Sequence, residues 1–201
     1  MKHIAMTGGI ASGKSTVAEF IRKTGTPIAD ADDFCRAVME PGMPAALEIA
    51  RRWPEVMTPG GIIDRAALGK IVFSDDSARR EEASIVLPAI HAAYKAWAAE
   101  CEAAGCALCV YDAALIFEHG LQKEFDGVLL VEAAPEIQIR RVMERNGFSE
   151  GAARLRIRAQ MPLEEKRRQA SWIIKNNGTL KDLEREFQRV WAAVMRFSKS
   201  D

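Results

Sequence analysis

Short apolar runs alternate with longer amphipathic segments along the chain, and this alternation predicts its order of strands and helices. An apolar stretch near the N-terminus leads through a glycine-rich loop into a helix, and a short strand follows that ends near Asp30. Further strands are predicted at Cys106–Tyr111, Gly127–Glu132 and Ser171–Lys175. The first two of these are apolar on both faces, as expected for a sheet that helices cover on each side. The pattern therefore indicates an α/β protein with a mostly parallel sheet.

Residues 32 to 105 show helical patterns with no strand between them. Asp64 is the expected N-cap of a helix over Arg65–Val72, and Asp75 opens a helix that contains Pro88. This block is too long for a single crossover between two strands, so we expect an inserted helical subdomain. Two further helices are predicted nearer the C-terminus, from Pro135 to about Arg145 and over Thr179–Phe197.

Composition and charge narrow the class of protein. The 28 Lys and Arg residues balance the 28 Asp and Glu residues, which argues against a general nucleic-acid binder but leaves room for a local basic pocket. No apolar run approaches the roughly 18 residues of a membrane span, and the N-terminal apolar stretch is too short for a signal peptide. We therefore expect a cytoplasmic monomer that acts on small molecules and has neither nucleic acid nor membrane as a partner.

Three of the four cysteines, Cys101, Cys106 and Cys109, have the spacing C-x4-C-x2-C, which suggests a metal or iron–sulfur site. Cys106 and Cys109 lie in an apolar run that is predicted to be a buried strand, where odd and even positions face opposite ways. Their thiols would then not converge on one ion. Reduced cysteines in the core are the expected outcome.

The loop after the first strand fits the phosphate-binding pattern G-x-x-x-x-G-K-[ST] in full, with the sequence Gly8-Gly9-Ile10-Ala11-Ser12-Gly13-Lys14-Ser15-Thr16. Glycines let the backbone turn its N–H groups toward phosphate oxygens, and the helix N-terminus adds partial positive charge. Lys14 is expected to reach the terminal phosphates, and the Ser15 hydroxyl to ligate Mg²⁺. A plain turn between strand and helix is the alternative, but the complete pattern in its required context favours nucleotide binding.

A phosphate loop alone does not separate kinases from GTPases or motor proteins, and the chain has no Asn-Lys-x-Asp element of guanine-specific proteins. Asp30, Asp32 and Asp33 follow the second strand, at the carboxyl edge where α/β sheets bind ligands. Carboxylates there suit a catalytic base or ligands to the water shell of Mg²⁺. One of them could instead cap the next helix, and we expect Asp32 or Asp33 to cap in part and at least one to be chemical.

Arginines form a second group of candidates. Cations stabilise the charge that phosphoryl transfer concentrates, and a mobile pair of helices carrying them would also exclude water. Glutamates are interleaved among these arginines, so most of them are expected on a solvated face. Arg141 and Arg145 are one helical turn apart and can share a face. The group comprises Arg140, Arg141, Arg145, Arg154, Arg156, Arg158, Arg167 and Arg168.

Taken together, these segments resemble the dephospho-coenzyme A kinase family, which performs the last step of coenzyme A synthesis, over nearly the whole chain. Thr7 and the loop that follows it are similar to the family's Thr-Gly-Gly-Ile form of the phosphate loop, which is more specific than the general pattern. Asp30-Ala31-Asp32, with Arg36 four residues further on, matches its Asp-Ala-Asp segment. Other segments resemble its helical substrate domain, the loop after its third strand and the loop beside its adenine: Gly61-Ile62-Ile63-Asp64-Arg65, Leu115-Ile116-Phe117-Glu118 and Ile174-Lys175-Asn176-Asn177-Gly178.

The resemblance implies a P-loop kinase with a five-stranded parallel core over residues 1–31, 105–140 and 170–201, a helical substrate-binding insertion at about 32–104 and an arginine-bearing lid at about 141–169. It implies transfer of the γ-phosphoryl group of ATP, with Mg²⁺, to the ribose 3′-hydroxyl of dephospho-coenzyme A. Asp32 would be the base, while Lys14 and Arg141 would stabilise the transferring charge. The implied nucleotide contacts are Gly9, Ile10, Ala11, Ser12, Gly13, Lys14, Ser15, Thr16, Arg145 and Asn177, with Ser15 also the metal ligand. The implied acceptor contacts are Thr7, Asp32, Arg36, Arg65 and Leu115.

The chain departs from the family pattern at Leu87, where a histidine precedes the proline in the family, and at Ala114, where the family has proline. An acidic residue expected before the last strand is replaced near Trp172. None of these changes touches the phosphate loop or Asp32. Two alternatives remain: another small-molecule P-loop kinase of the nucleoside or nucleoside-monophosphate type, and a nucleotide-binding protein with weakened turnover.

Overall fold

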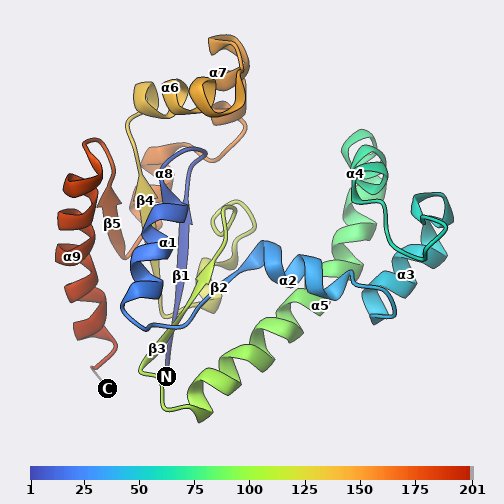
Figure 1. Cartoon of the computed structure of the whole chain (residues 1–201), viewed down its shortest axis with the longest axis horizontal. Helices are drawn as coiled ribbons and strands as arrows, with labels where there is room; N and C mark the ends of the chain where they lie inside the picture. The colour runs from blue at the N-terminus through green and yellow to red at the C-terminus, as the bar shows by residue number, and fades with distance from the viewer. Residues whose placement is uncertain (200–201) are drawn as a thin grey trace. The chain divides into compact units, whose positions relative to one another are not determined.

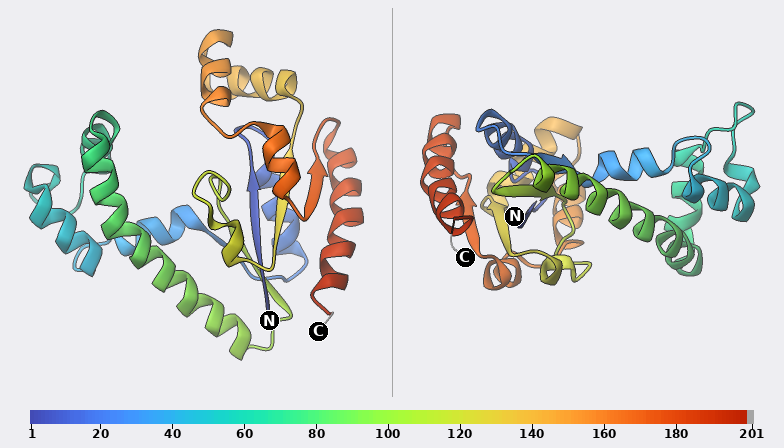
Figure 2. Two further views of the ribbon diagram at one scale, coloured as in Figure 1. Left: turned by 180° about the vertical axis from the view of Figure 1, so that it is seen from behind. Right: turned by 90° about the horizontal axis from the view of Figure 1, so that it is seen from below.

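The structure, a computed structural model, describes residues 1–199 of the chain, which divides into two compact units. The first unit comprises residues 1–29 together with the chain from residue 101 onward, and the second comprises residues 30–100. The first contains a sheet with helices, whereas the second is built from helices (Figures 1 and 2). Within residues 1–199, no helix combines the length and the apolar character that crossing a membrane requires.

A five-stranded parallel sheet forms the centre of the first unit, with the strand order β2-β3-β1-β4-β5. Its strands are β1 (Lys2–Gly8), β2 (Ile28–Asp30), β3 (Leu108–Asp112), β4 (Gly127–Glu132) and β5 (Trp172–Lys175). The first strand pairs with β3 and β4, so that Met6 lies opposite both Asp112 and Leu129. Because β1 is central, the loop that follows it emerges in the middle of the carboxyl edge. The predicted five-stranded parallel sheet is confirmed.

Helices α1 (Lys14–Lys23) and α9 (Leu180–Phe197) contribute to one apolar core with the sheet. Val17 and Ile21 of α1 and Phe187 and Trp191 of α9 pack into this core, and all four side chains are buried. The alternation of Ile4 and Met6 along β1 directs both toward the same core. This packing fixes α1, and therefore fixes the end of the glycine loop that leads into it.

The remaining helices of the first unit follow the later strands. They are α6 (Pro135–Asn146), α7 (Glu150–Arg158), α8 (Leu163–Gln169) and a short 3₁₀ helix η2 (Leu121–Glu124). The helix that was predicted to begin at Pro135 does so, and α6 packs against α7 through Val142 and Ala153. Figure 1 shows α6 and α7 beyond the carboxyl ends of β1 and β4. These two helices therefore lie on the side of the sheet from which the glycine loop emerges.

The second unit has its own apolar core, formed by residues that include Ile49, Trp53, Val56 and Leu68. Its elements are α2 (Ala31–Val38), α3 (Pro44–Arg52), the 3₁₀ helix η1 (Pro54–Val56), α4 (Arg65–Ser74) and α5 (Asp76–Ala103). The Asp64 side chain accepts hydrogen bonds from the backbone N–H groups of Ala66 and Ala67, as an N-cap does. The predicted helix after Asp64 is thus confirmed, and so is the helix after Asp75 with an internal proline.

Two local expectations were wrong. The N-cap of α2 is Asp30, whose carboxylate accepts from the N–H of Asp32, and not Asp32 or Asp33. The reason is that β2 ends at Asp30 in an extended conformation and α2 begins at the next residue, which leaves no linker for a later cap. The strand expected from Cys106 begins at Leu108, because the Cys106 N–H bonds to the Cys101 carbonyl oxygen beyond the end of α5.

Candidate active site

The glycine loop between β1 and α1 contains two residues with positive φ, of which only one is a glycine. Gly13, the N-cap of α1, has φ 93°, in the left-handed region that glycine adopts freely. Ala11 has φ 56°, which is uncommon for a residue with a side chain and marks local strain. A Cβ atom on Gly13 would lie 2.1 Å from Asn176 Nδ2. The loop thus depends on glycine at position 13 both for its turn and for its close approach to Asn176.

Lys14 begins α1 and points to the neighbouring strand. Its Nζ lies 2.5 Å from Oδ1 of Asp112, the last residue of β3. The Asp112 side chain is 3% exposed and that of Lys14 is 20% exposed, so the two opposite charges are largely removed from water. The register of β1 and β3 explains why these two side chains meet: Met6 of β1 is paired with Asp112 of β3, two residues before the glycine loop begins. A cation and an anion are thereby held at the start of the helix.

Ser15 follows in the first turn of α1 with an exposed side chain, and Thr16 is half-buried. The Ser12 hydroxyl oxygen is buried and has no hydrogen-bond partner within residues 1–199. A buried polar atom of this kind normally finds a partner in a ligand or an ordered water. The hydroxyl of Ser15 is therefore open to solvent, whereas that of Ser12 is buried.

Side chains from three other segments bind the backbone of the loop. Gln138 of α6 donates from Nε2 to the Ile10 carbonyl oxygen at 2.7 Å, and Asn176 donates from Nδ2 to the Ser12 carbonyl oxygen at 2.8 Å. Arg141, one turn after Gln138, donates from Nη1 to the Ala11 carbonyl oxygen at 3.4 Å. Gln160, between α7 and α8, accepts from the Ile10 N–H at 2.7 Å. The loop is thus enclosed by groups that are far away in the sequence.

The two arginines expected to share a face of α6 differ in their contacts. The half-buried Arg141 also donates from Nη2 to the backbone and side-chain oxygens of Asn176, at 3.3 Å each. Arg145 is exposed, and its Nε donates to Asn146 Oδ1 at 3.1 Å. The structure therefore brings Arg141, and not Arg145, to the glycine loop.

Several other arginines pair with glutamates, as the interleaved sequence suggests. Arg154 lies 2.7 Å from Glu150, and Arg140 lies 4.0 Å from Glu144. Arg167 of α8 is different, because it bonds both oxygens of the buried Glu132 at the end of β4, at 2.7 and 2.9 Å. These hydrogen bonds raise the pKa of Arg167 above its usual range. The arginine thereby ties α8 to the sheet.

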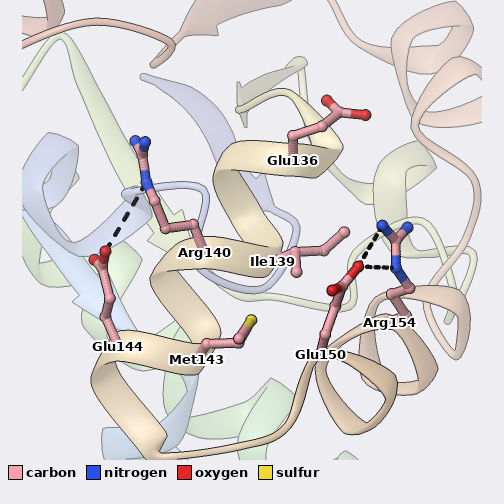
Figure 3. Close-up of a pocket in the computed structure, with 7 residues that line it drawn as sticks. All are labelled: Glu136, Ile139, Arg140, Met143, Glu144, Glu150 and Arg154. Carbon is pink, nitrogen blue, oxygen red and sulfur yellow. Dashed lines mark hydrogen bonds and ion pairs between the residues drawn. The ribbon is translucent and has the colours of Figure 1, made fainter.

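A pocket of about 360 Å³ lies between α6 and α7 (Figure 3). Ile139 and Met143 contribute apolar side chains, and the charged residues around them form the pairs Arg140–Glu144 and Arg154–Glu150. Its lining contains no residue of the glycine loop. The pocket is therefore separate from the side chains of α6 that bind the loop.

Other expected site residues of the first unit are engaged with the backbone or exposed. Thr7 is fully buried, and its hydroxyl donates to the Ala114 carbonyl oxygen at 2.9 Å. Leu115, the next residue, is 39% exposed. Asn177 accepts from the Ala134 N–H through Oδ1 at 2.8 Å, which links the segment after β5 to the one after β4. Thr7 and Asn177 therefore fix the loops that surround the carboxyl edge.

The remaining expected residues lie in the second unit. Asp32 is exposed in the first turn of α2, and within residues 1–199 its carboxylate has no hydrogen-bond or ion-pair partner. Asp33 is paired with Arg36, whereas the Nη2 of Arg65 lies 3.6 Å from the Cys35 sulfur. Burial raises the pKa of the Cys35 thiol above its ordinary value. Of the three aspartates, Asp32 is thus the one whose carboxylate is available to a ligand.

Sequence reasoning missed Asp112, Gln138, Gln160 and the bonds that Asn176 makes to the loop. For Asp112 a signal existed, because it is the first acidic residue after an apolar strand and so lies at the carboxyl edge of the sheet. The glutamines carry no such signal, since they occur in amphipathic segments where glutamine is an ordinary surface residue. Only the folded chain brings them to Ile10.

Comparison with known proteins decides the family. The sequence profile of the Dephospho-CoA kinase family matches residues 2–182. The chain belongs to the dephospho-CoA kinase family. It is 45% identical over 195 residues to the dephospho-CoA kinase of Geobacillus kaustophilus, an alignment that covers 95% of this chain and 97% of that one.

Solved structures agree with membership of the dephospho-CoA kinase family. A crystal structure from Thermus thermophilus is similar with a TM-score of 0.83 at 37% identity, over 96% of this chain and 97% of that one. The dephospho-CoA kinase of Campylobacter jejuni is similar with a TM-score of 0.76 at 26% identity, with the same coverage. The family and the fold predicted from the sequence are therefore confirmed.

Proposed function

We propose that this chain catalyses the ATP-dependent phosphorylation of the ribose 3′-hydroxyl of dephospho-coenzyme A, the last step of coenzyme A synthesis, which yields coenzyme A and ADP. The observation that carries the proposal is the complete phosphate loop at the carboxyl edge of the sheet, with Lys14 held at Asp112, in a chain of this family. Enzymes of this kind use ATP as the phosphoryl donor, and the loop offers the groups that phosphates require.

Nucleotide binding is assigned to the loop and its surroundings. The N–H groups of Gly9, Ala11 and Gly13 and the N-terminus of α1 supply donors and partial positive charge for the phosphate oxygens. The N–H groups of Ile10 and Ser12 are bonded within the protein, to Gln160 and to the Gly9 carbonyl oxygen. Lys14 neutralises charge on the terminal phosphates, and it does so from a position fixed by Asp112. Arg145 and Asn177 are also assigned as nucleotide contacts, because the family resemblance implies them.

A magnesium ion fits the oxygen donors at the start of α1. Mg²⁺ prefers oxygen ligands and is usually bound through one or two carboxylates together with substrate phosphates. Ser15 has an exposed hydroxyl and Asp112 supplies a carboxylate, so these two residues would hold the ion with the nucleotide. The described residues contain no group of three or more His, Cys, Asp or Glu side chains suited to a metal. When bound, the ion would neutralise charge on the nucleotide phosphates.

Phosphoryl transfer requires positioning and charge stabilisation more than covalent chemistry by the protein. Arg141 has five N–H donors, and its contacts with Ala11 and Asn176 leave donors for the transferring group. Asp32 is assigned as the group that orients or deprotonates the ribose 3′-hydroxyl, and its unpartnered carboxylate supports this role. Arg36, Arg65, Leu115 and Thr7 are assigned to the acceptor side, with Thr7 acting through the loop at Ala114.

The test measures ADP release with three acceptors: dephospho-coenzyme A, AMP and adenosine. Dephospho-coenzyme A should be preferred in kcat/KM by a wide margin, because binding of its remote pantetheine arm holds the hydroxyl in place for reaction. Equal or better turnover of a nucleoside or AMP would instead assign the chain to another class of small-molecule kinase. ATP binding without ADP release from any acceptor would indicate a nucleotide-binding protein with lost turnover.

A further inference from the structure

Three consecutive carbonyl oxygens of the phosphate loop each accept a hydrogen bond from a side-chain nitrogen. Ile10 accepts from Gln138, Ala11 from Arg141 and Ser12 from Asn176. The donors come from two distant segments, α6 and the residue after β5. We name the donors Gln138, Arg141 and Asn176 the carbonyl clasp.

The geometry of the peptide bond gives this arrangement a consequence. In a planar trans peptide the C=O and the N–H of the next residue point in opposite directions. Binding the carbonyls of Ile10 and Ser12 therefore directs the N–H groups of Ala11 and Gly13 away from the donors, whereas the Ser12 N–H bonds to the Gly9 carbonyl oxygen at 3.0 Å within the loop. These N–H groups belong to the stretch that the motif assigns to the phosphates. A bonded carbonyl also polarises its peptide and makes the attached N–H a stronger donor.

We propose that the carbonyl clasp, and Gln138 in particular, positions the phosphate loop for ATP, so that its members act on nucleotide affinity through the loop backbone. This proposal rests on the proposed function. Gln138 is the member best suited to the test, because it is 6% exposed and its bond to Ile10 is the shortest of the three, at 2.7 Å.

The strain in the loop supports a positioning role. Ala11 keeps φ 56° although it has a side chain, so surrounding contacts must hold it in that conformation. The clasp bonds the carbonyls of Ala11 and of both its neighbours. The fit is also close on the Gln138 side, where a Cβ atom on Gly9 would lie 2.7 Å from Gln138 Nε2.

Gln138 and Gln160 bind the two ends of the same residue with opposite polarity. Gln138 donates to the Ile10 carbonyl oxygen, whereas Gln160 accepts from the Ile10 N–H. The same substitution, Gln to Glu, therefore has different consequences at the two positions. At 138 it removes the donor and places a carboxylate oxygen beside a carbonyl oxygen, whereas at 160 it keeps an acceptor.

The experiment compares Gln138→Glu with Gln160→Glu, and uses Gln188→Glu, at an exposed position of α9, as the control for added charge. ATP dissociation constants are measured by calorimetry without an acceptor, and KM is measured for both substrates. We expect Gln138→Glu to weaken ATP binding by about tenfold, because it removes one hydrogen bond and also places a negative charge beside the Ile10 carbonyl oxygen. Gln160→Glu should have a smaller effect, and KM for dephospho-coenzyme A should change less than KM for ATP.

A purely structural role for Gln138 predicts something different: a lower thermal midpoint with ATP affinity unchanged in the folded protein, or equal changes in KM for both substrates. Either result would overturn the proposal, as would an equal loss of ATP affinity in Gln160→Glu. If Gln138→Glu does not fold, Gln138→Met removes the donor without adding charge and should weaken ATP binding about threefold. If the wild-type protein binds ATP but phosphorylates no acceptor, while Gln138→Glu still weakens ATP binding, the proposed function is contradicted and the role of the clasp is supported.

Discussion

Two roles are assigned to Lys14, and a single substitution of this residue would test both. It is assigned to the nucleotide phosphates, and it also neutralises the buried carboxylate of Asp112 from 2.5 Å. Removing one partner of a largely buried ion pair leaves the other charge uncompensated, which costs more than the pair itself contributes. We therefore expect the lysine to stabilise the protein without nucleotide as well as to act in the proposed reaction.

Lys14→Met should nearly abolish ADP release and should also lower the free energy of unfolding by about 3 kcal/mol at neutral pH. The double variant Lys14→Met with Asp112→Asn should regain much of that stability while staying inactive, because it removes the stranded charge but not the need for a cation. Urea unfolding and an ADP-release assay measure the two effects. Normal turnover in a folded Lys14→Met protein would remove the phosphate-loop assignment.

Asp30 and Asp32 are two residues apart, and the structure separates their roles. Asp30 caps α2, whereas the Asp32 carboxylate is exposed and unpartnered within the described part of the chain. Asp32→Asn should therefore leave the thermal midpoint unchanged and lower kcat by about 100-fold, at the lower end of the range for a general base, since the loose transition state needs little early deprotonation.

The matched variant for this prediction is Asp30→Ala. It should lower the free energy of unfolding by about 1 kcal/mol, the usual worth of an N-cap. Thermal midpoints and kcat are measured side by side for the two proteins. A normal rate in Asp32→Asn would end its assignment as the base and make Asp33 the next candidate.

At the scale of the element, the N-terminus of α9 shows how a cap sets a pH dependence. Asp182 accepts hydrogen bonds from the backbone and the hydroxyl of Thr179, and these bonds, with help from Arg185, lower its pKa to about 2. A carboxylate with a lowered pKa stabilises the folded protein above its ordinary pKa. That stabilisation is lost as the pH falls toward the folded value.

The stability difference between the wild-type protein and Asp182→Asn should accordingly be constant above about pH 5 and should shrink between about pH 4 and pH 2. Urea midpoints measured across this range would show the change. Glu184→Gln, on the same helix, is the control for removing a surface carboxylate. A difference that stays constant down to pH 3 would contradict the role given to the cap.

The anchoring of α8 supplies a second element-scale test. Arg167 covers the buried Glu132 with two hydrogen bonds, so Arg167→Met should destabilise the protein by about 3 kcal/mol. Glu132→Gln combined with Arg167→Met should recover part of this loss, because no buried charge is then left alone. Equal stability of the wild-type and Arg167→Met proteins would show that the pair contributes nothing.

At the scale of the whole molecule, patterns close together in sequence were predictable and contacts distant in sequence were not. The parallel sheet followed from apolar runs, and the phosphate loop from residues 8 to 16, because both depend on neighbouring positions. Gln138 and Asn176 reach that loop only when α6 packs against it and β5 joins the sheet, and they are 128 and 164 residues from the atoms they bind. The predicted N-cap of α2 was wrong for a local reason: β2 ends at Asp30 and α2 begins at the next residue, so Asp30 itself is the cap.

Binding of nucleotide to the folded chain should raise its stability by mass action. ATP at 100 times its dissociation constant stabilises a protein that binds it only when folded by about 2.7 kcal/mol. The thermal midpoint should therefore rise with ATP concentration in the wild-type protein and stay constant in Lys14→Met. An equal rise in both proteins would place nucleotide binding away from Lys14.

The division into two units also has an optical consequence. The chain's four tryptophans are shared equally, with Trp53 and Trp97 in the second unit and Trp172 and Trp191 in the first. Trp53 and Trp191 are both well buried in the cores of their respective units, so emission from each should shift to the red when its own surroundings unfold. Proteins that retain only one of these two indoles would report on one unit at a time. Comparing their fluorescence midpoints would show directly whether the two cores are lost together or one after the other.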